Sequence, residues 1–173
     1  MSAMDPPATV TSVTFGIGWD GVSAGGRAGL DLDLSAFALD AAGAIVSDQH
    51  FVFFNNAMSP ERAIVHAGLP SAQFQETMTV HTGQLGSSVR RVVVGVTAYN
   101  GEGNFGRFSG GHIAVSDSVG GQLADYDLYL HMAGALAVAY GEVYRDGGGW
   151  RFRALGERFD SLGAMAATYG VNV

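Results

Sequence analysis

Glycine is the feature of this sequence that most limits what the chain can fold into. The chain has 26 glycines among its 173 residues. A glycine inside a helix or strand costs about 0.5–1 kcal/mol relative to alanine, whereas tight turns tolerate it easily. Helices of ordinary length therefore have few places to form, and the sequence favours short strands joined by turns.

Alternation of apolar and polar residues predicts strands over most of the chain. In residues 30–35, leucines at even positions alternate with polar residues, which gives a strand with one apolar face. From Phe37 and Leu39 onward the apolar residues stand at odd positions, so we expect a bulge near Ala36. Residues 91–99 are nearly all apolar, which is typical of a strand covered on both faces.

The other predicted elements are short. Strands are expected at residues 10–16, 51–54, 63–66, 77–81, 112–117, 122–128, 136–145 and 150–155. Helical spacing occurs only between Leu162 and Tyr169, after a capping Asp160 or Ser161 and before Gly170. Each half-buried sheet must cover its apolar face with another layer. The prediction is therefore a mostly β fold, a two-sheet β-sandwich with a short C-terminal helix.

Length and composition predict one domain. The chain is 47% hydrophobic and only 14% charged, so it can bury a core of its own. Residues 1–8 are predicted to be a flexible N-terminal tail, and residues 9–173 a single β-sandwich domain. We find neither a signal sequence nor the roughly 20 apolar residues that a membrane span requires. We therefore expect a cytoplasmic protein that does not insert into membranes.

The charge of the chain excludes some partners and favours others. The formal net charge is −7, and all nine basic residues are arginines. No basic stripe is available to displace counterions from phosphates, so we expect no nucleic-acid binding. An acidic chain suits cations or basic protein surfaces. The absence of cysteine excludes disulfides and thiolate metal sites.

Sequence motifs for catalysis are weak. Residues 101–106 match G-x-G-x-x-G, but more glycines and another strand follow where a dinucleotide site needs a helix. We interpret this segment as a glycine-rich hairpin. The five histidines lack zinc-ligand spacing, and no serine has a recognisable nucleophile setting. The prediction is that the protein is not an enzyme.

Oxygen-bearing side chains offer a candidate site. Asp31 and Asp33 share one strand face, about 7 Å apart at the backbone. Asp20, Ser35, Asn55 and Asn56 lie in or next to loops that a sandwich could gather at one end. Calcium takes about six to eight such oxygens. A water-facing strand and a simple turn explain the same residues, and composition alone favours that interpretation.

Several runs of the sequence resemble the TerD family. They are GIGWD at 16–20, LDLDLSAF at 30–37, FVFFNN at 51–56, YDL at 126–128, GEVYR at 141–145, WRFRALG at 150–156 and YGV at 169–171. The runs keep the family's order. The resemblance implies a calcium-binding β-sandwich that belongs to bacterial tellurite-resistance and general stress-response systems. It also implies a membrane partner of the TerC type.

One loop departs from the family pattern. After His66, typical members have an Asp-Asn pair and a glycine-rich stretch that ends in Gly-Asp-Asp-Glu and supplies calcium ligands. Here the loop is shortened to residues 69–76, in which Glu76 matches the final glutamate while Phe74 and Gln75 replace the two aspartates. The remaining candidate ligands are Asp20, Asp31, Asp33, Asn55, Asn56 and Glu76. We expect them to bind calcium at best once, with an affinity on the order of tens of micromolar or weaker, or to have lost it.

The sequence therefore predicts a TerD-like stress-response protein. It would act as a non-catalytic binding or scaffold module, through protein contacts and a degenerate calcium site. The expected partners are a TerC-type membrane protein or a second copy of the chain. The alternative is a self-assembling structural subunit that has lost calcium binding, because sheet edges without lysine favour self-association.

Overall fold

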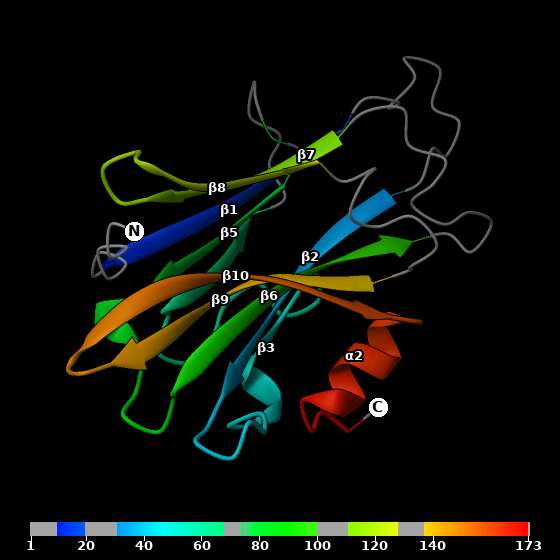
Figure 1. Ribbon diagram of the computed structural model, residues 1–173. Helices are drawn as coiled ribbons and strands as arrows, with labels where there is room; N and C mark the ends of the chain where they lie inside the picture. Colours follow the sequence, from blue (N-terminus) through cyan, green and yellow to red (C-terminus); the bar gives the residue numbers. More distant parts are fainter. Residues whose placement is uncertain are drawn as a thin grey trace, which may run out of the picture.

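A computed structural model describes residues 10–19, 31–67, 74, 76–99, 111–127 and 137–172. Two antiparallel sheets face each other, and a short helix near the C-terminus lies on the outer side of one of them (Figure 1). The predicted mostly β sandwich with a C-terminal helix is confirmed. The predicted tail, residues 1–8, and the predicted hairpin at 101–106 lie outside the described residues.

Each sheet contains five strands in the described part of the chain. In order, sheet A consists of β4 (Ile64–Ala67), β5 (Glu76–His81), β1 (Ser12–Trp19), β7 (Gly111–Asp117) and β8 (Gln122–Asp127). Sheet B consists of β10 (Gly149–Phe159), β9 (Ala137–Asp146), β6 (Arg91–Tyr99), β2 (Asp31–Leu39) and β3 (Phe51–Val52). The helix α2 spans Leu162–Thr168, and 3-10 turns occur at Asp48–His50 (η1) and Thr82–Gln84 (η2).

The main core lies between the two sheets. The even-numbered residues of β2, from Leu32 to Ala38, pack there against Phe15 and Ile17 of β1. Val92 to Thr97 of β6 are buried on both faces, as their apolar run predicts. Burial of such side chains contributes about 1.5–3 kcal/mol each, which makes this layer the main source of stability.

β2 runs straight through the position where a bulge was expected. It pairs with β6 over its whole length without a register shift. Phe37 and Leu39 therefore lie on the outer face of sheet B, where Met165 and Tyr169 cover them. The predicted bulge near Ala36 is wrong. The apolar residues change parity because the second face of the strand also becomes buried, under the C-terminal segment.

The helix is held by the caps that the sequence indicates. The Ser161 hydroxyl accepts a hydrogen bond from the N–H of Ala164 at 3.0 Å. Gly170 follows the helix with φ of +81°, a conformation that glycine adopts without strain. Met165 lies so close over β6 that a Cβ built on Gly95 would come within 2.9 Å of its Cε atom. The glycine therefore lets α2 approach the sheet.

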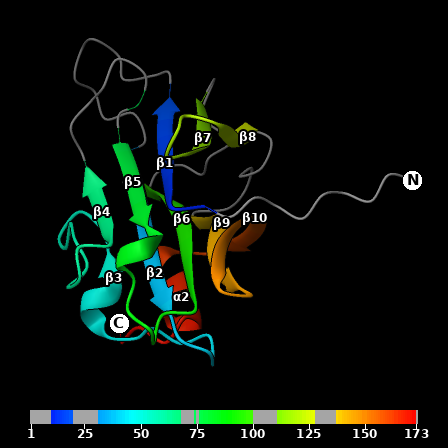
Figure 2. The same cartoon turned by 90° about the vertical axis from the view of Figure 1, so that its left-hand side faces the viewer.

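The two ends of the sandwich carry different features. β2 begins at Asp31 opposite Tyr99, where β6 ends. β5 begins at Glu76 opposite Ile17 of β1. Asp31, Asp33 and Glu76 thus belong to this end, whereas η1 and the C-terminal residues lie toward the other end (Figure 2).

Candidate functional site

Glu76 links the two sheets at the end where β2 and β5 begin. Its side chain is buried, with 6% of the residue exposed. Its Oε1 atom accepts a hydrogen bond of 2.7 Å from the N–H of Leu34. The same oxygen pairs with Nε2 of His66 on β4. β3 pairs with β2 only at Ala36 and Phe37, so Leu34 lies beyond the paired stretch and Glu76 of the opposite sheet supplies its acceptor.

These contacts limit what Glu76 can offer a metal ion. A carboxylate oxygen has two lone pairs, and two donors already occupy Oε1. Only the second oxygen is left for an ion. In the structure Glu76 therefore connects the two sheets, whereas the sequence predicted it as a calcium ligand.

Asp33 stands beside two buried hydroxyl groups on the outer face of sheet B. Its cross-strand partner is Thr97 of β6, and Ser35 follows two residues later on the same face. Thr97 and Ser35 are 4% and 1% exposed, and within the described residues neither hydroxyl oxygen has a hydrogen-bond partner. We call Asp33, Ser35 and Thr97 the oxygen cluster. Asp31 begins the same strand, and Asp20 lies outside the described residues.

The two asparagines stabilise the turn that follows β3. Asn56 donates from its amide nitrogen to the backbone carbonyls of Gln49 and Phe51, at 3.0 and 2.8 Å. Asn55 is exposed in the same turn. Because β3 is antiparallel to β2, the chain leaves it in the direction of Asp33. The Phe53–Asn56 bridge turns the chain directly after β3, so Asn56 has a structural role next to η1.

The oxygen cluster fits calcium chemically, but only as a weak site. Carboxylate and hydroxyl oxygens are hard ligands of the kind that calcium prefers. The cluster has a single carboxylate, and the described residues hold no group of three or more histidine or acidic side chains placed for a metal. Calcium affinity falls with the number of charged ligands, so the cluster suits low affinity.

Comparison with known proteins shows to which family the chain belongs. The family model described as TerD domain matches residues 3–169. The chain belongs to the TerD family. It is 32% identical to a tellurium resistance protein TerD of Serratia marcescens, over 95% of this chain and 90% of that protein. It is 31% identical to the general stress protein 16U of Bacillus subtilis, over the same shares of both chains.

A solved structure confirms the fold of this TerD-family chain. The crystal structure of a homologue of the telluride resistance protein TerD from Streptomyces coelicolor A3(2) superposes with a TM-score of 0.73. The two chains are 28% identical, and the match covers 88% of this chain and 92% of the other. Fold and family thus agree with the sequence resemblance.

Phe74 occupies a position where the resemblance to TerD proteins implies an aspartate. Its ring lies against β1, because a Cβ built on Gly16 would come within 2.7 Å of the ring. The ring centroid is 6.1 Å from that of His112 on β7. An aromatic ring offers no oxygen ligand, so this position packs against sheet A and adds nothing to a calcium site.

A hydrogen-bonded chain that no sequence motif predicts joins Ser47, His50 and Glu61. The Ser47 hydroxyl lies 2.6 Å from Nδ1 of His50, whose Nε2 lies 3.0 Å from Glu61. Hydrolases use the same residue types, but they also need donors aimed at a developing oxyanion. Here Asp48 follows the serine and adds negative charge. We assign this chain of contacts to fastening η1 onto the loop that precedes β4.

Another missed residue is Glu142 of β9, whose carboxylate is completely buried. It accepts hydrogen bonds from Arg91 at 3.0 Å and from Arg153. Its signal in the sequence was a single acid within the apolar run 136–145. Its partners could not be read from the sequence, because they lie on two other strands.

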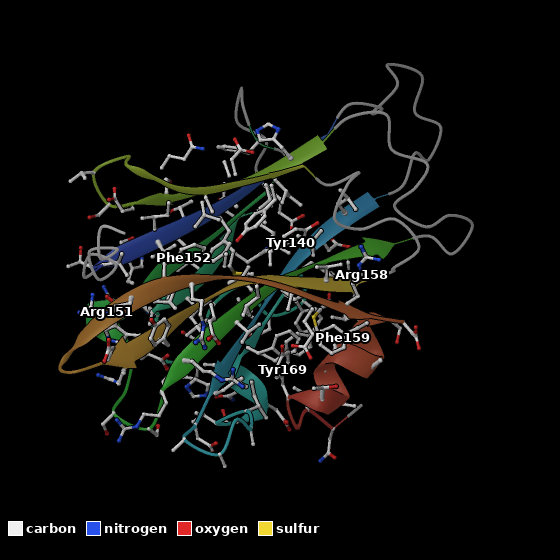
Figure 3. All side chains as sticks on the ribbon, in the orientation of Figure 1. Tyr140, Arg151, Phe152, Arg158, Phe159 and Tyr169 are labelled. Carbon is white, nitrogen blue, oxygen red and sulfur yellow. The ribbon has the colours of Figure 1, made fainter. Side chains whose placement is uncertain are left out.

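Two tyrosines have side-chain pKa values raised above the ordinary value of 10.0. Burial raises the pKa of Tyr126 to about 12. Burial, assisted by the nearby carboxylate of Glu157, raises the pKa of Tyr169 to about 12 as well. Both phenols therefore stay protonated near neutral pH and do not serve there as general bases. Figure 3 shows Tyr169 on the side of sheet B that faces away from sheet A.

Proposed function

We propose that this protein is a TerD-family stress-response protein that works by binding, without catalysing a reaction, and that it holds calcium weakly. The observation that carries the stress-response part is the match to the TerD domain along residues 3–169, together with relatives named for tellurium resistance and general stress. The names of these relatives mention neither calcium nor a partner, so experiments must test both parts of the proposal.

The oxygen cluster supports the calcium part of the proposal. Beside Asp33, two buried hydroxyls have no hydrogen-bond partner in the described part of the chain, which is unusual because buried polar groups nearly always have one. Bound calcium would supply positive charge and accept these oxygens as ligands. The engagement of Glu76 Oε1 by two donors and the ring of Phe74 keep the number of ligands small.

Thermal unfolding of metal-stripped protein tests the calcium part. A ligand that binds only the folded state stabilises it by about 2.7 kcal/mol at a concentration of 100 times its Kd. We expect millimolar calcium to raise the Tm of the wild type and magnesium to raise it less. The D33N variant should lose this gain, whereas D125N, on an exposed residue of β8, should keep it. An equal gain in D33N would refute the site.

The edge of sheet B counts against the alternative of a self-assembling subunit. The edge strand β10 has a register shift between Ala154 and Glu157. Such irregularities disturb the row of backbone groups that another chain would pair with. Light scattering during a calcium titration separates the two functions. A large oligomer independent of calcium would favour the assembly role, and a small particle throughout favours the binding module.

A further inference from the structure

The outer face of sheet B carries a group of arginines next to the area that α2 covers. Arg91 of β6 and Arg151 of β10 are both cross-strand partners of Tyr144 on β9. Arg153 lies two residues along β10 and thus on the same face. We call Arg91, Tyr144, Arg151 and Arg153 the arginine face. Tyr144, Arg151 and Arg153 belong to the runs GEVYR and WRFRALG, but neither run by itself shows that these side chains meet Arg91 on one face.

A buried carboxylate holds two of these guanidinium groups in place. The two oxygens of Glu142 accept hydrogen bonds from Arg91 and Arg153, one each. The guanidinium of Arg153 also lies 4.9 Å from the ring centre of Tyr144. Side chains that are fixed before a partner arrives lose less entropy on binding. The arrangement is therefore suited to recognition as well as to stability.

The fixed guanidinium groups still reach solvent. The side chain of Arg153 is 57% exposed and that of Arg91 is 36% exposed. A guanidinium has five N–H donors, and Glu142 takes one from each of these two residues. Further donors on both residues can bind an incoming carboxylate, which the planar fork of arginine matches in geometry.

The charge of this face is opposite in sign to that of the whole chain. In the described ion pairs its three arginines meet two carboxylates: Glu142 pairs with Arg91 and Arg153, and Asp146 lies 2.8 Å from Arg151. One positive charge is left over on a chain of net charge −7. A long polyanion or an anionic membrane would meet repulsion from the remaining surface. A short acidic segment would contact the arginine face alone.

We propose that the arginine face binds an acidic segment of a partner protein, through carboxylates seated on Arg91, Arg151 and Arg153. Arginine and tyrosine are the residue types that most often dominate binding at protein interfaces. The inference rests on the proposed role as a binding module and names the chemistry of its partner. It does not depend on calcium.

Fluorescence anisotropy with a labelled hexaglutamate peptide tests the proposal on the full chain at about 50 mM salt, where surface charges are weakly screened. We expect the wild type to bind it and to ignore a labelled hexaglutamine peptide. The R151Q/R153Q variant should bind about tenfold more weakly or worse, since charge pairs at an interface carry that much affinity. It retains Arg91 as a partner for the buried Glu142.

R158Q is the matched control, because Arg158 is exposed on the same strand but lies near its other end (Figure 3). It should bind hexaglutamate like the wild type, and melting curves should show that both variants are folded. The proposal fails if hexaglutamate does not bind or if R158Q weakens binding equally. It also fails if inorganic phosphate or phosphatidylserine vesicles bind through these arginines while the peptide does not. Loss of calcium binding alone would leave it standing.

Discussion

The carboxylate of Glu76 accepts a hydrogen bond of 2.7 Å from the backbone N–H of Leu34, and this contact joins sheet A to sheet B. It closes the end of the sandwich at a point where β3 has already left β2. The shortened loop that precedes Glu76 thus still delivers one carboxylate to a defined place. That place has a structural consequence whether or not an ion is bound.

Replacing Glu76 with alanine should destabilise the protein in the absence of calcium. The change leaves the buried N–H of Leu34 and the ring of His66 without their acceptor, and each buried group left unsatisfied costs about 1–3 kcal/mol. Urea unfolding should show this loss for E76A and a smaller one for E76Q, which keeps an acceptor oxygen. D125A, at an exposed position, is the control. Unchanged stability of E76A would show that the contact is unimportant.

Removing the two arginines that pair with Glu142 should lower the stability of the protein more than removing the charge of Glu142 itself. R91Q/R153Q leaves a completely buried carboxylate without a charged partner, which typically costs about 3–5 kcal/mol. E142Q instead releases two arginines that can turn toward water. Chemical denaturation of both variants should therefore place E142Q well above R91Q/R153Q in stability. The reverse order would contradict the burial of Glu142.

The close approach of α2 to sheet B makes Gly95 sensitive to a single methyl group. In G95A the added carbon would lie 2.9 Å from Met165 and 3.0 Å from the backbone oxygen of Val138. Overpacking of this kind costs about 1–3 kcal/mol. G156A is the matched control, because no atom lies within 4 Å of a carbon added there. Differential scanning calorimetry should show a lower Tm for G95A only.

Stability should fall at alkaline pH because of the buried phenols. The pKa of Tyr169 is about 12 in the folded chain and near 10 when exposed, so only the unfolded state releases this proton in between. The stabilisation is complete below pH 10 and is lost as the pH rises toward 12. Y169F cannot ionise there, so its unfolding free energy should fall less steeply over this range. An equally steep fall of the unfolding free energy in the wild type and in Y169F would contradict the raised pKa of Tyr169.

Most of the fold could be predicted from the strand patterns and the helix-capping residues, because both depend only on residues that are neighbours in the sequence. The alternation in 77–81 predicted the half-buried β5, and Ser161 and Gly170 bounded the helix correctly. The change of parity at Phe37 was misread as a bulge. A strand that is covered on its second face and a strand that contains a bulge show the same change in the positions of their apolar residues. Only the position of α2 over the outer face of β2 shows which of the two is present.

The candidate site was less predictable, because it depends on contacts between distant segments. The aspartate pattern correctly put Asp33 on a strand face, but Ser35 beside it is buried where a wet face was expected. Nothing local shows that Glu76 is engaged by Leu34, 42 residues away in the chain. The buried pairing of His66 with Glu76 likewise joins two strands, and nothing in the residues next to His66 predicts it.

Isothermal titration of metal-stripped protein with calcium tests the account most directly. A binding module with few remaining carboxylates should bind calcium with a Kd on the order of tens of micromolar or weaker. The heat of binding should disappear in D33N and persist in D125N. Submicromolar binding, or binding that is the same in D33N, would contradict the account.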